Sequence, residues 1–134
     1  MFEKIKNWIR ARRPWMFNNS KIPVFLSHFT PIEIWAISFG PFVACRGVMS
    51  KTTERHEIIH FQQQVEMLFI FQWIAYATFW LIGMVRYRGD GKTAYYENPF
   101  EREAYYNEKK YKYLERRPFY NWVNYVGNKT SEGW

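Results

Sequence analysis

The sequence contains a His-Glu-x-x-His pattern at residues 56–60, which holds two of the three histidines of the chain. Residues four apart on an α-helix lie on one side, so the imidazoles of His56 and His60 project from one face. This spacing suits Zn²⁺, which binds imidazole nitrogen at about 2.0–2.1 Å and takes three protein ligands in a hydrolytic site. Glu57 lies beside this face, where its carboxylate can accept a proton from a water molecule. We predict a zinc site at His56 and His60, with Glu57 as the general base.

The same pattern has a simpler interpretation, in which the two histidines lie on a helix surface without a metal. A pattern with three fixed positions occurs by chance in about one chain of this length in a hundred or fewer, because histidine is rare, and this favours a site. Gln63 and Gln64 continue the face of His56 and His60 by one turn. The third histidine, His28, falls in a predicted loop and is not included in the site.

A hydrolytic zinc site with two histidines needs a third protein ligand, for which Glu101 and Glu103 are the best candidates. They lie about 200° apart on a helix that is predicted to start at Asn98, so only one can point at the metal. Ala104 is small and allows close helix packing beside Glu101, whereas Asn107 can support Glu103 by a hydrogen bond to a ligand histidine. Asn98 and Glu101 also have the spacing of a capping box, in which the carboxylate binds the Asn98 N–H. The residues themselves leave both glutamates open.

Together the two motifs resemble those of the gluzincin metallopeptidases, whose third ligand is a glutamate in a Glu-x-x-Ala-Asp pattern on a second helix. The pattern maps onto Glu101, Ala104 and Tyr105, with Tyr105 where the family has Asp, and the resemblance covers about residues 32–108. It implies a zinc-dependent peptidase acting on peptide or protein substrates, with Glu101 as the third ligand and Glu103 as the alternative. The departure at Tyr105 puts in doubt the usual contact to a ligand histidine. The stretch from His60 to Gln64 also resembles the His-x-x-Gln-Gln continuation of some small zincin-like proteins. Short proteins of this general look, with Phe-Glu-x-Glu-Ala after an apolar helix, are common in phage and bacterial genomes.

In the mechanism that the resemblance implies, the zinc ion polarises the scissile carbonyl and Glu57 passes the proton of the water to the leaving amine. A tyrosine such as Tyr105 or Tyr106 would donate to the oxyanion. The competing hypothesis is a non-catalytic protein, in which the same metal staples a small aromatic domain in a virion or at a membrane. A third hypothesis is a single-pass membrane protein with a coincidental motif.

The composition indicates one folded domain over residues 1–134. Hydrophobic residues make up 48% and aromatic residues 22% of the chain, which excludes global disorder. So many aromatic rings indicate either a core filled with large side chains or a surface at a membrane interface. The net charge of +7 comes from basic clusters near both ends, and we expect no dedicated nucleic-acid site. The single cysteine, Cys45, excludes an intrachain disulfide and is predicted to be buried.

The N-terminal segment, residues 1–13, is amphipathic and basic and is predicted to form a helix that ends at Pro14. It lacks the apolar run of a secretory signal. Such a helix can cover the core or lie on a membrane surface. We expect a cytoplasmic or peripheral-membrane protein in which this helix covers the core, with this segment and residues 67–85 as the candidate contacts to a membrane surface.

The fold is predicted to be mainly α with a small β-hairpin, an α+β class with a minimal zincin-like core. Residues 15–31 are predicted as a loop with a short extended piece at 22–26. Strands are predicted at 32–38 and 42–46, joined by a turn at 39–41. The hairpin either offers its edge to an extended peptide or only covers one side of the motif helix.

The motif helix is predicted to start at Ser50, Thr52 or Thr53 and to run into the uncharged segment 67–85. By length this segment is a transmembrane candidate. A single crossing would, however, separate the motif histidines from a ligand further along the chain. We therefore predict a buried or interface-embedded helix, which either breaks near its middle or is followed by an extended return over 88–97.

The second helix is predicted to run from Asn98 to about Glu115 and to end before Pro118. The aromatic segment 119–125 is predicted to form a short helix or strand on the core. Residues 128–134 are predicted to form a flexible tail.

Overall fold

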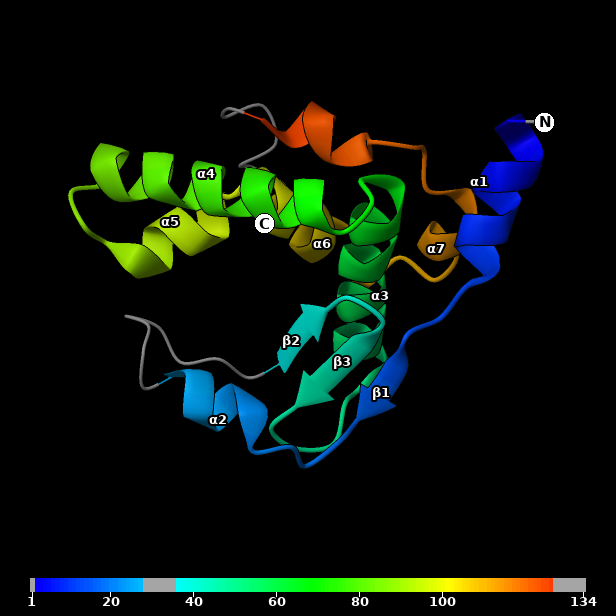
Figure 1. Ribbon diagram of the computed structural model, residues 1–134, viewed down its shortest axis with the longest axis horizontal. Helices are drawn as coiled ribbons and strands as arrows, with labels where there is room; N and C mark the ends of the chain where they lie inside the picture. Colours follow the sequence, from blue (N-terminus) through cyan, green and yellow to red (C-terminus); the bar gives the residue numbers. More distant parts are fainter. Residues whose placement is uncertain (1, 28–35, 127–134) are drawn as a thin grey trace.

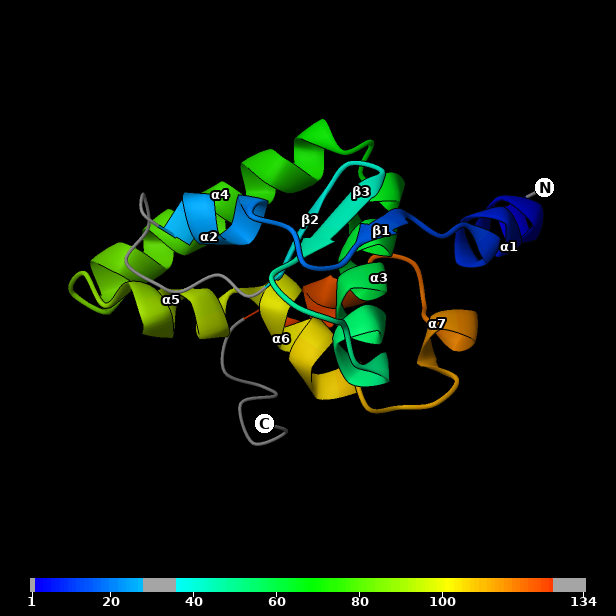
Figure 2. The same ribbon diagram turned by 90° about the horizontal axis from the view of Figure 1, so that it is seen from below.

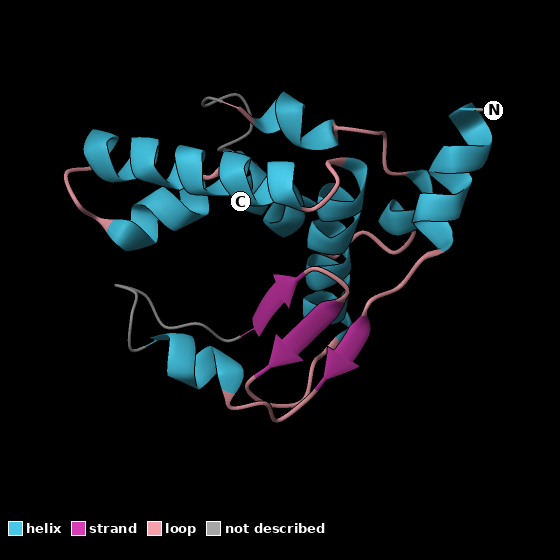
Figure 3. Ribbon diagram, in the orientation of Figure 1, coloured by secondary structure: helices cyan, strands magenta, loops and turns pink. Residues whose placement is uncertain are grey.

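The computed structural model describes residues 2–27 and 36–126, which form a mainly helical structure with a three-stranded mixed sheet (Figures 1 and 3). The predicted α+β class is therefore confirmed. Three sequence predictions lie outside the described residues: the loop position of His28, the first part of the predicted strand at 32–35 and the tail at 128–134.

The small sheet has the order β1-β3-β2. Strands β2 (Ala36–Phe39) and β3 (Phe42–Cys45) form the predicted antiparallel hairpin, and Gly40 at its turn has a φ of 59°, which favours glycine. The prediction of a loop at Trp15–Phe17 is wrong, because these residues form β1, parallel to β3. A three-residue strand is too short to show a period-two pattern, so only its pairing with β3 defines it.

The prediction of an extended piece at 22–26 is also wrong, because Ile22–Ser27 forms the short helix α2. The Ser20 hydroxyl accepts a hydrogen bond from the Ile22 N–H at 3.2 Å, and Pro23 lies in the first turn, where its missing N–H costs nothing. Local capping outweighs the β propensity of this apolar segment.

Helix α3 (Lys51–Glu66) carries the His-Glu-x-x-His pattern and begins at Ser50, one of the three predicted caps. It ends before helix α4 (Ile70–Arg86), and the two axes meet at 115°, which confirms the predicted break. The bend contains Leu68 and Phe69 with positive φ values of 56° and 62°. No single helix among the described residues is long and apolar enough to span a bilayer, although α3 and α4 together pass that test by length and composition.

The apolar segment was predicted to be buried or interface-embedded, and the buried placement is wrong for most of α4, where only Gln72 and Gly83 are buried. Helix α5 (Gly91–Glu97) lies along α4, as Figure 1 shows, and starts at the cap residue Asp90. The alternative of an extended return over 88–97 is therefore also wrong.

Helix α6 (Pro99–Asn107) begins at Asn98 as predicted but ends eight residues before the predicted end at Glu115. The Asn107 amide donates to the Glu103 carbonyl at 2.8 Å and to the Tyr125 hydroxyl at 3.0 Å. These side-chain bonds take the place of a further helical turn.

The C-terminal part continues through α7 (Tyr113–Arg116) and the 3₁₀ helix η1 (Asn121–Tyr125). At the other end of the chain, α1 (Phe2–Ala11) contacts α3 and α7 and buries Ile9. Cys45 is buried in β3, as predicted.

Helix α3 is the central element, since it contacts β2, α4, α6 and α7. Figure 2 shows α6 beside α3, with the sheet on another side of the helix. This arrangement brings the motif histidines of α3 to the glutamates of α6.

Candidate metal centre

Three potential metal ligands from two helices converge in the interior. The Nε2 atoms of His56 and His60 lie 3.2 Å apart on α3. Oε1 of Glu101, on α6, lies 3.1 Å from the first nitrogen and 3.0 Å from the second. All three residues are buried and form a group that can hold a metal ion.

The spacing of these atoms fits a tetrahedral ion. At zinc bond lengths of about 2.0–2.1 Å, tetrahedral donor atoms lie about 3.3–3.4 Å apart, within a few tenths of an ångström of the three separations. His56, His60 and Glu101 would hold such an ion through three ligand atoms, one fewer than a tetrahedral ion takes. Imidazole and carboxylate donors suit several divalent metals, so the donor set alone does not fix the metal.

Each histidine is oriented by a hydrogen bond from its second ring nitrogen. His56 Nδ1 lies 2.8 Å from Oε2 of Glu108, and His60 Nδ1 lies 2.9 Å from Oε1 of Gln63. A carboxylate oxygen and an amide oxygen are acceptors, so both Nδ1 atoms carry the hydrogen in the neutral rings. The Nε2 lone pairs of both histidines then point toward Oε1 of Glu101. Three hydrogen-bond acceptors this close together repel one another unless a cation, either a proton or a metal ion, lies between them.

The charges of the three candidate ligands affect one another strongly. Burial lowers the pKa of His56, but hydrogen bonds to Glu101 and Glu108 outweigh it and raise the pKa to about 10. The pKa of His60 is also raised, since Glu101 outweighs burial. Burial raises the pKa of the Glu101 carboxyl, but the two histidines bring it below its usual range. In the absence of metal, protons stabilise this cluster, and a metal ion would displace them.

Glu101 is oriented by a hydrogen bond from Tyr76, a residue that the sequence did not indicate as part of the site. The Tyr76 hydroxyl of α4 donates to Oε2 of Glu101 at 2.7 Å, which leaves Oε1 facing the histidines. The capping-box interpretation of Glu101 is wrong, since the Asn98 N–H donates to the Tyr95 carbonyl. Tyr76 interrupts the apolar segment of α4, and this polar break was the only signal in the sequence.

Glu103 points away from the histidines. Its carboxylate accepts hydrogen bonds from Gln63, Tyr113 and Arg117, all of them buried. Asn107 contacts no ligand histidine, since its amide donates to the Glu103 carbonyl and to Tyr125. Glu103 reaches the site only indirectly, because the Gln63 amide that it binds orients His60.

Glu57 lies directly after His56 on α3 and is 6% exposed. Burial raises the pKa of its carboxyl, and the nearby His56 and His60 offset part of that rise. Across the described residues, its carboxylate takes part in no hydrogen bond or ion pair. A buried carboxylate with a raised pKa beside a cation site is suited to accept a proton.

Around the site, the two predicted tyrosine donors are placed differently. Tyr105 packs edge-on against the His56 ring at a centroid distance of 4.4 Å, and its hydroxyl bonds Tyr95 at 3.0 Å. Tyr106 instead lies against Lys110. Position 105 thus contributes a ring contact to His56, and the carboxylate that contacts His56 Nδ1 is that of Glu108. Glu108 follows Glu101 by seven residues, a spacing that returns to the same side of a helix.

No family model, curated protein or solved structure matches this chain.

Proposed function

We propose that the protein is a zinc-dependent metallopeptidase. The observation that supports the proposal most strongly is the convergence of His56, His60 and Glu101 at tetrahedral separations, with Glu57 next to His56 in sequence. Imidazole and carboxylate ligands with an open fourth position form the donor set of hydrolytic zinc sites. Zinc is our assignment of the metal.

Each residue around the proposed zinc ion has a separate role in the proposed reaction. A bound Zn²⁺ would supply a Lewis acid that polarises a carbonyl and acidifies a water molecule. The Glu57 carboxylate takes a proton from the attacking water and delivers it to the leaving amine nitrogen. Glu108 and Gln63 hold the ligand histidines in one tautomer and one orientation.

The sheet offers a place for an extended substrate. In the strand order β1-β3-β2, strand β2 is an edge strand, so one of its sides has no partner strand within residues 36–126. Strand β2 packs against α3, which carries the motif. An extended peptide can pair with such an edge by main-chain hydrogen bonds.

Replacement of Glu57 tests the proposal. Glu57→Gln keeps the size of the side chain and the metal ligands, so we expect full zinc content and a loss of peptide hydrolysis of about 10²–10⁴-fold. Glu54→Gln, one turn earlier on α3, is the matched control and retains activity. A wild-type protein that binds zinc but cleaves no member of a diverse peptide library contradicts the proposal.

The burial of the site favours a second candidate, a metal ion that only staples the fold. The three ligands are 4–7% exposed, and closed sites are typical of structural zinc. In this case Glu57→Gln changes neither zinc content nor any activity, and removal of the metal unfolds the protein. The peptide library therefore separates the two candidates.

A further inference from the structure

Helix α4 exposes a continuous apolar face. Ile70, Ile74, Leu81 and Val85 follow one another at spacings of four, seven and four residues and so lie on one side of the helix. All four side chains are exposed, by 58%, 59%, 58% and 83% respectively. The helix has no charged residue before Arg86. An apolar face of this length on a surface helix indicates a binding surface.

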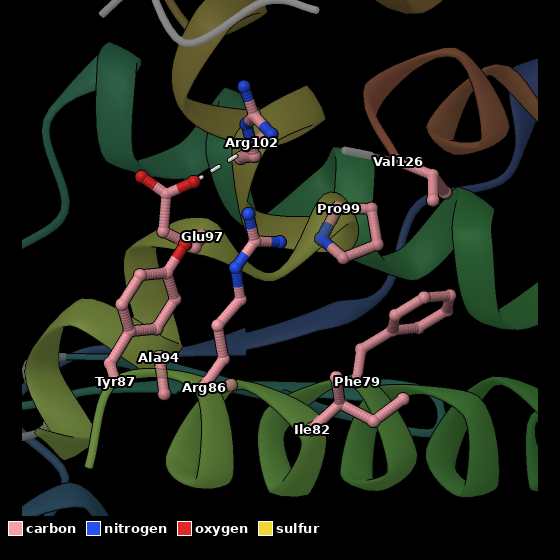
Figure 4. A pocket seen from close by; sticks show the side chains of 10 residues that line it. Phe79, Ile82, Arg86, Tyr87, Ala94, Glu97, Pro99, Arg102 and Val126 are labelled. Carbon is pink, nitrogen blue, oxygen red and sulfur yellow. Dashed lines mark ion pairs between the residues drawn. The ribbon is translucent and has the colours of Figure 1, made fainter. Parts of the chain in front are cut away.

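A positively charged cavity adjoins this face at the C-terminal half of α4. Figure 4 shows it between α4 and the residues Pro99, Arg102 and Val126, with Arg86 extending toward them from α4. Its volume is about 200 Å³. Ile82, which is 55% exposed, lines the cavity and also borders the apolar face.

The cavity contains two guanidinium groups and one carboxylate. Arg102 is 2% exposed, and its Nε and Nη2 atoms have no hydrogen-bond partner among the described residues. Its ion pair with Glu97 is long, at 3.7 Å, as the dashed line in Figure 4 marks. Arg86 adds a second positive charge at the exposed side. The cavity therefore carries net positive charge and suits an acidic group.

We propose that α4 lies on the surface of an anionic membrane. Its apolar face enters the boundary between headgroups and acyl chains, and the cavity of Arg86 and Arg102 binds an acidic lipid headgroup. Helices with one apolar face and basic flanks bind bilayers in this way. The net charge of +7 adds a long-range attraction to anionic lipid. The inference does not depend on the metal centre.

A bilayer fits these observations better than a second copy of the chain. In a parallel pair of α4 helices, Arg86 at the C-terminal end of α4 would lie next to the same cation of the second copy, and in an antiparallel pair it would face the uncharged start of α4. Neither arrangement gives Arg86 or the nearby Arg88 an acidic partner from α4, whereas anionic headgroups attract both. Acidic lipid also satisfies the unpaired nitrogens of Arg102. A dimer remains an outcome that the experiment detects.

The test is flotation of the purified full chain with vesicles. We expect it to float with mixed phosphatidylcholine–phosphatidylglycerol vesicles and much less with phosphatidylcholine alone. The double variant Ile74→Glu/Leu81→Glu should lose flotation, whereas Val48→Glu, at an apolar residue that is 72% exposed away from α4, should keep it. Circular dichroism checks that the variants stay helical.

Two arginine variants test the cavity. Arg88→Gln removes one exposed charge outside the cavity and should weaken vesicle binding by no more than about fivefold, the effect of one basic residue near an anionic surface. Arg86→Gln removes the same charge from the cavity and should weaken binding at least tenfold. Inorganic phosphate, added at the same total negative charge as the vesicles, should not displace the protein from the vesicles, since phosphate lacks acyl chains.

Three results would overturn the inference. One is equal flotation with both vesicle types, and another is equal losses for the two arginine variants. The third is a wild-type dimer in sedimentation experiments that Ile74→Glu/Leu81→Glu converts to monomer without any vesicle binding. That last result would assign the apolar face of α4 to a second copy of the chain.

Discussion

At the scale of single residues, each ligand of the candidate metal centre has its own hydrogen-bond partner, from the same helix for His60 and from another part of the chain for His56. Glu108 binds His56, Gln63 binds His60 and Tyr76 binds Glu101. Such partners set the tautomer, direction and basicity of a ligand, and their loss weakens metal binding even though the ligands remain. These partners therefore fix the orientation of the three candidate ligands.

Glu108 provides the test of this orientation. We expect Glu108→Ala to weaken zinc affinity by about 10–100-fold, because His56 loses the carboxylate that holds its Nδ1 hydrogen. Competition with a chromogenic chelator measures the affinity. Glu115→Ala, at an exposed glutamate of α7, should bind zinc like the wild type. An unchanged affinity in Glu108→Ala would show that Glu108 does not support the ligand.

The spacing of His56, Glu57 and His60 was readable from the sequence because a single helix determines it. The choice between Glu101 and Glu103 as the third ligand could not be predicted from these residues alone, since it depends on which side of α6 faces α3. That side is determined by distant residues, among them Arg117, which binds Glu103. Tyr76 was equally hidden, because a lone tyrosine in an apolar segment usually marks packing rather than a site.

At the scale of elements, the close approach of α4 and α5 depends on Gly83. A Cβ atom added at Gly83 would lie 2.9 Å from the Cβ and 3.0 Å from the Cα of Ala94. The second of these atoms is backbone, so the helices themselves must move apart to accept a side chain. Because Tyr76 and Phe100 also pack together, α4 is linked through this region to the helix that carries Glu101.

We expect Gly83→Ala to destabilise the protein by about 1–3 kcal/mol, the usual effect of overpacking a tight contact. The favourable helix propensity of alanine opposes this effect but is smaller, about 1 kcal/mol. Urea unfolding followed by circular dichroism gives the free energy of unfolding. Ala77→Gly, on the exposed side of α4, isolates the propensity effect. A Gly83→Ala variant that is more stable than the wild type would contradict the packing.

The elements show where prediction from sequence succeeds. The starts of α3 and α6 were predicted because Ser50 and Asn98 cap their helices through local bonds. The end of α6 was predicted wrongly, because Asn107 forms a hydrogen bond with Tyr125, which lies in a distant segment of the chain. Of the two placements predicted for the apolar segment, the buried one is wrong for most of α4, since hydropathy alone does not distinguish a core helix from a helix with an exposed apolar face.

At the scale of the whole molecule, a buried ion network joins three segments. Arg117 forms ion pairs with Glu66 of α3 and Glu103 of α6, and all three side chains are buried. The Arg117 carbonyl in turn accepts hydrogen bonds from Arg10 of α1. The network therefore links α3 and α6, the two helices that carry the candidate metal ligands.

We expect Arg117→Met to destabilise the fold by about 3–5 kcal/mol, because it leaves two buried carboxylates without a counter-charge. Arg116→Met, at the exposed neighbouring residue, should lie within about 0.5 kcal/mol of the wild type. Thermal and urea unfolding measure both variants. Equal stabilities would show that the network contributes nothing to the fold.

The zinc content of the purified protein, measured by elemental mass spectrometry after dialysis against a weak chelator, tests the proposed zinc site. We expect one zinc ion per chain in the wild type and in Glu115→Ala, and almost none in Glu101→Ala. A wild-type protein without zinc after growth in zinc-supplemented medium would contradict it. So would a Glu101→Ala variant with full zinc content, since the third ligand would then lie elsewhere.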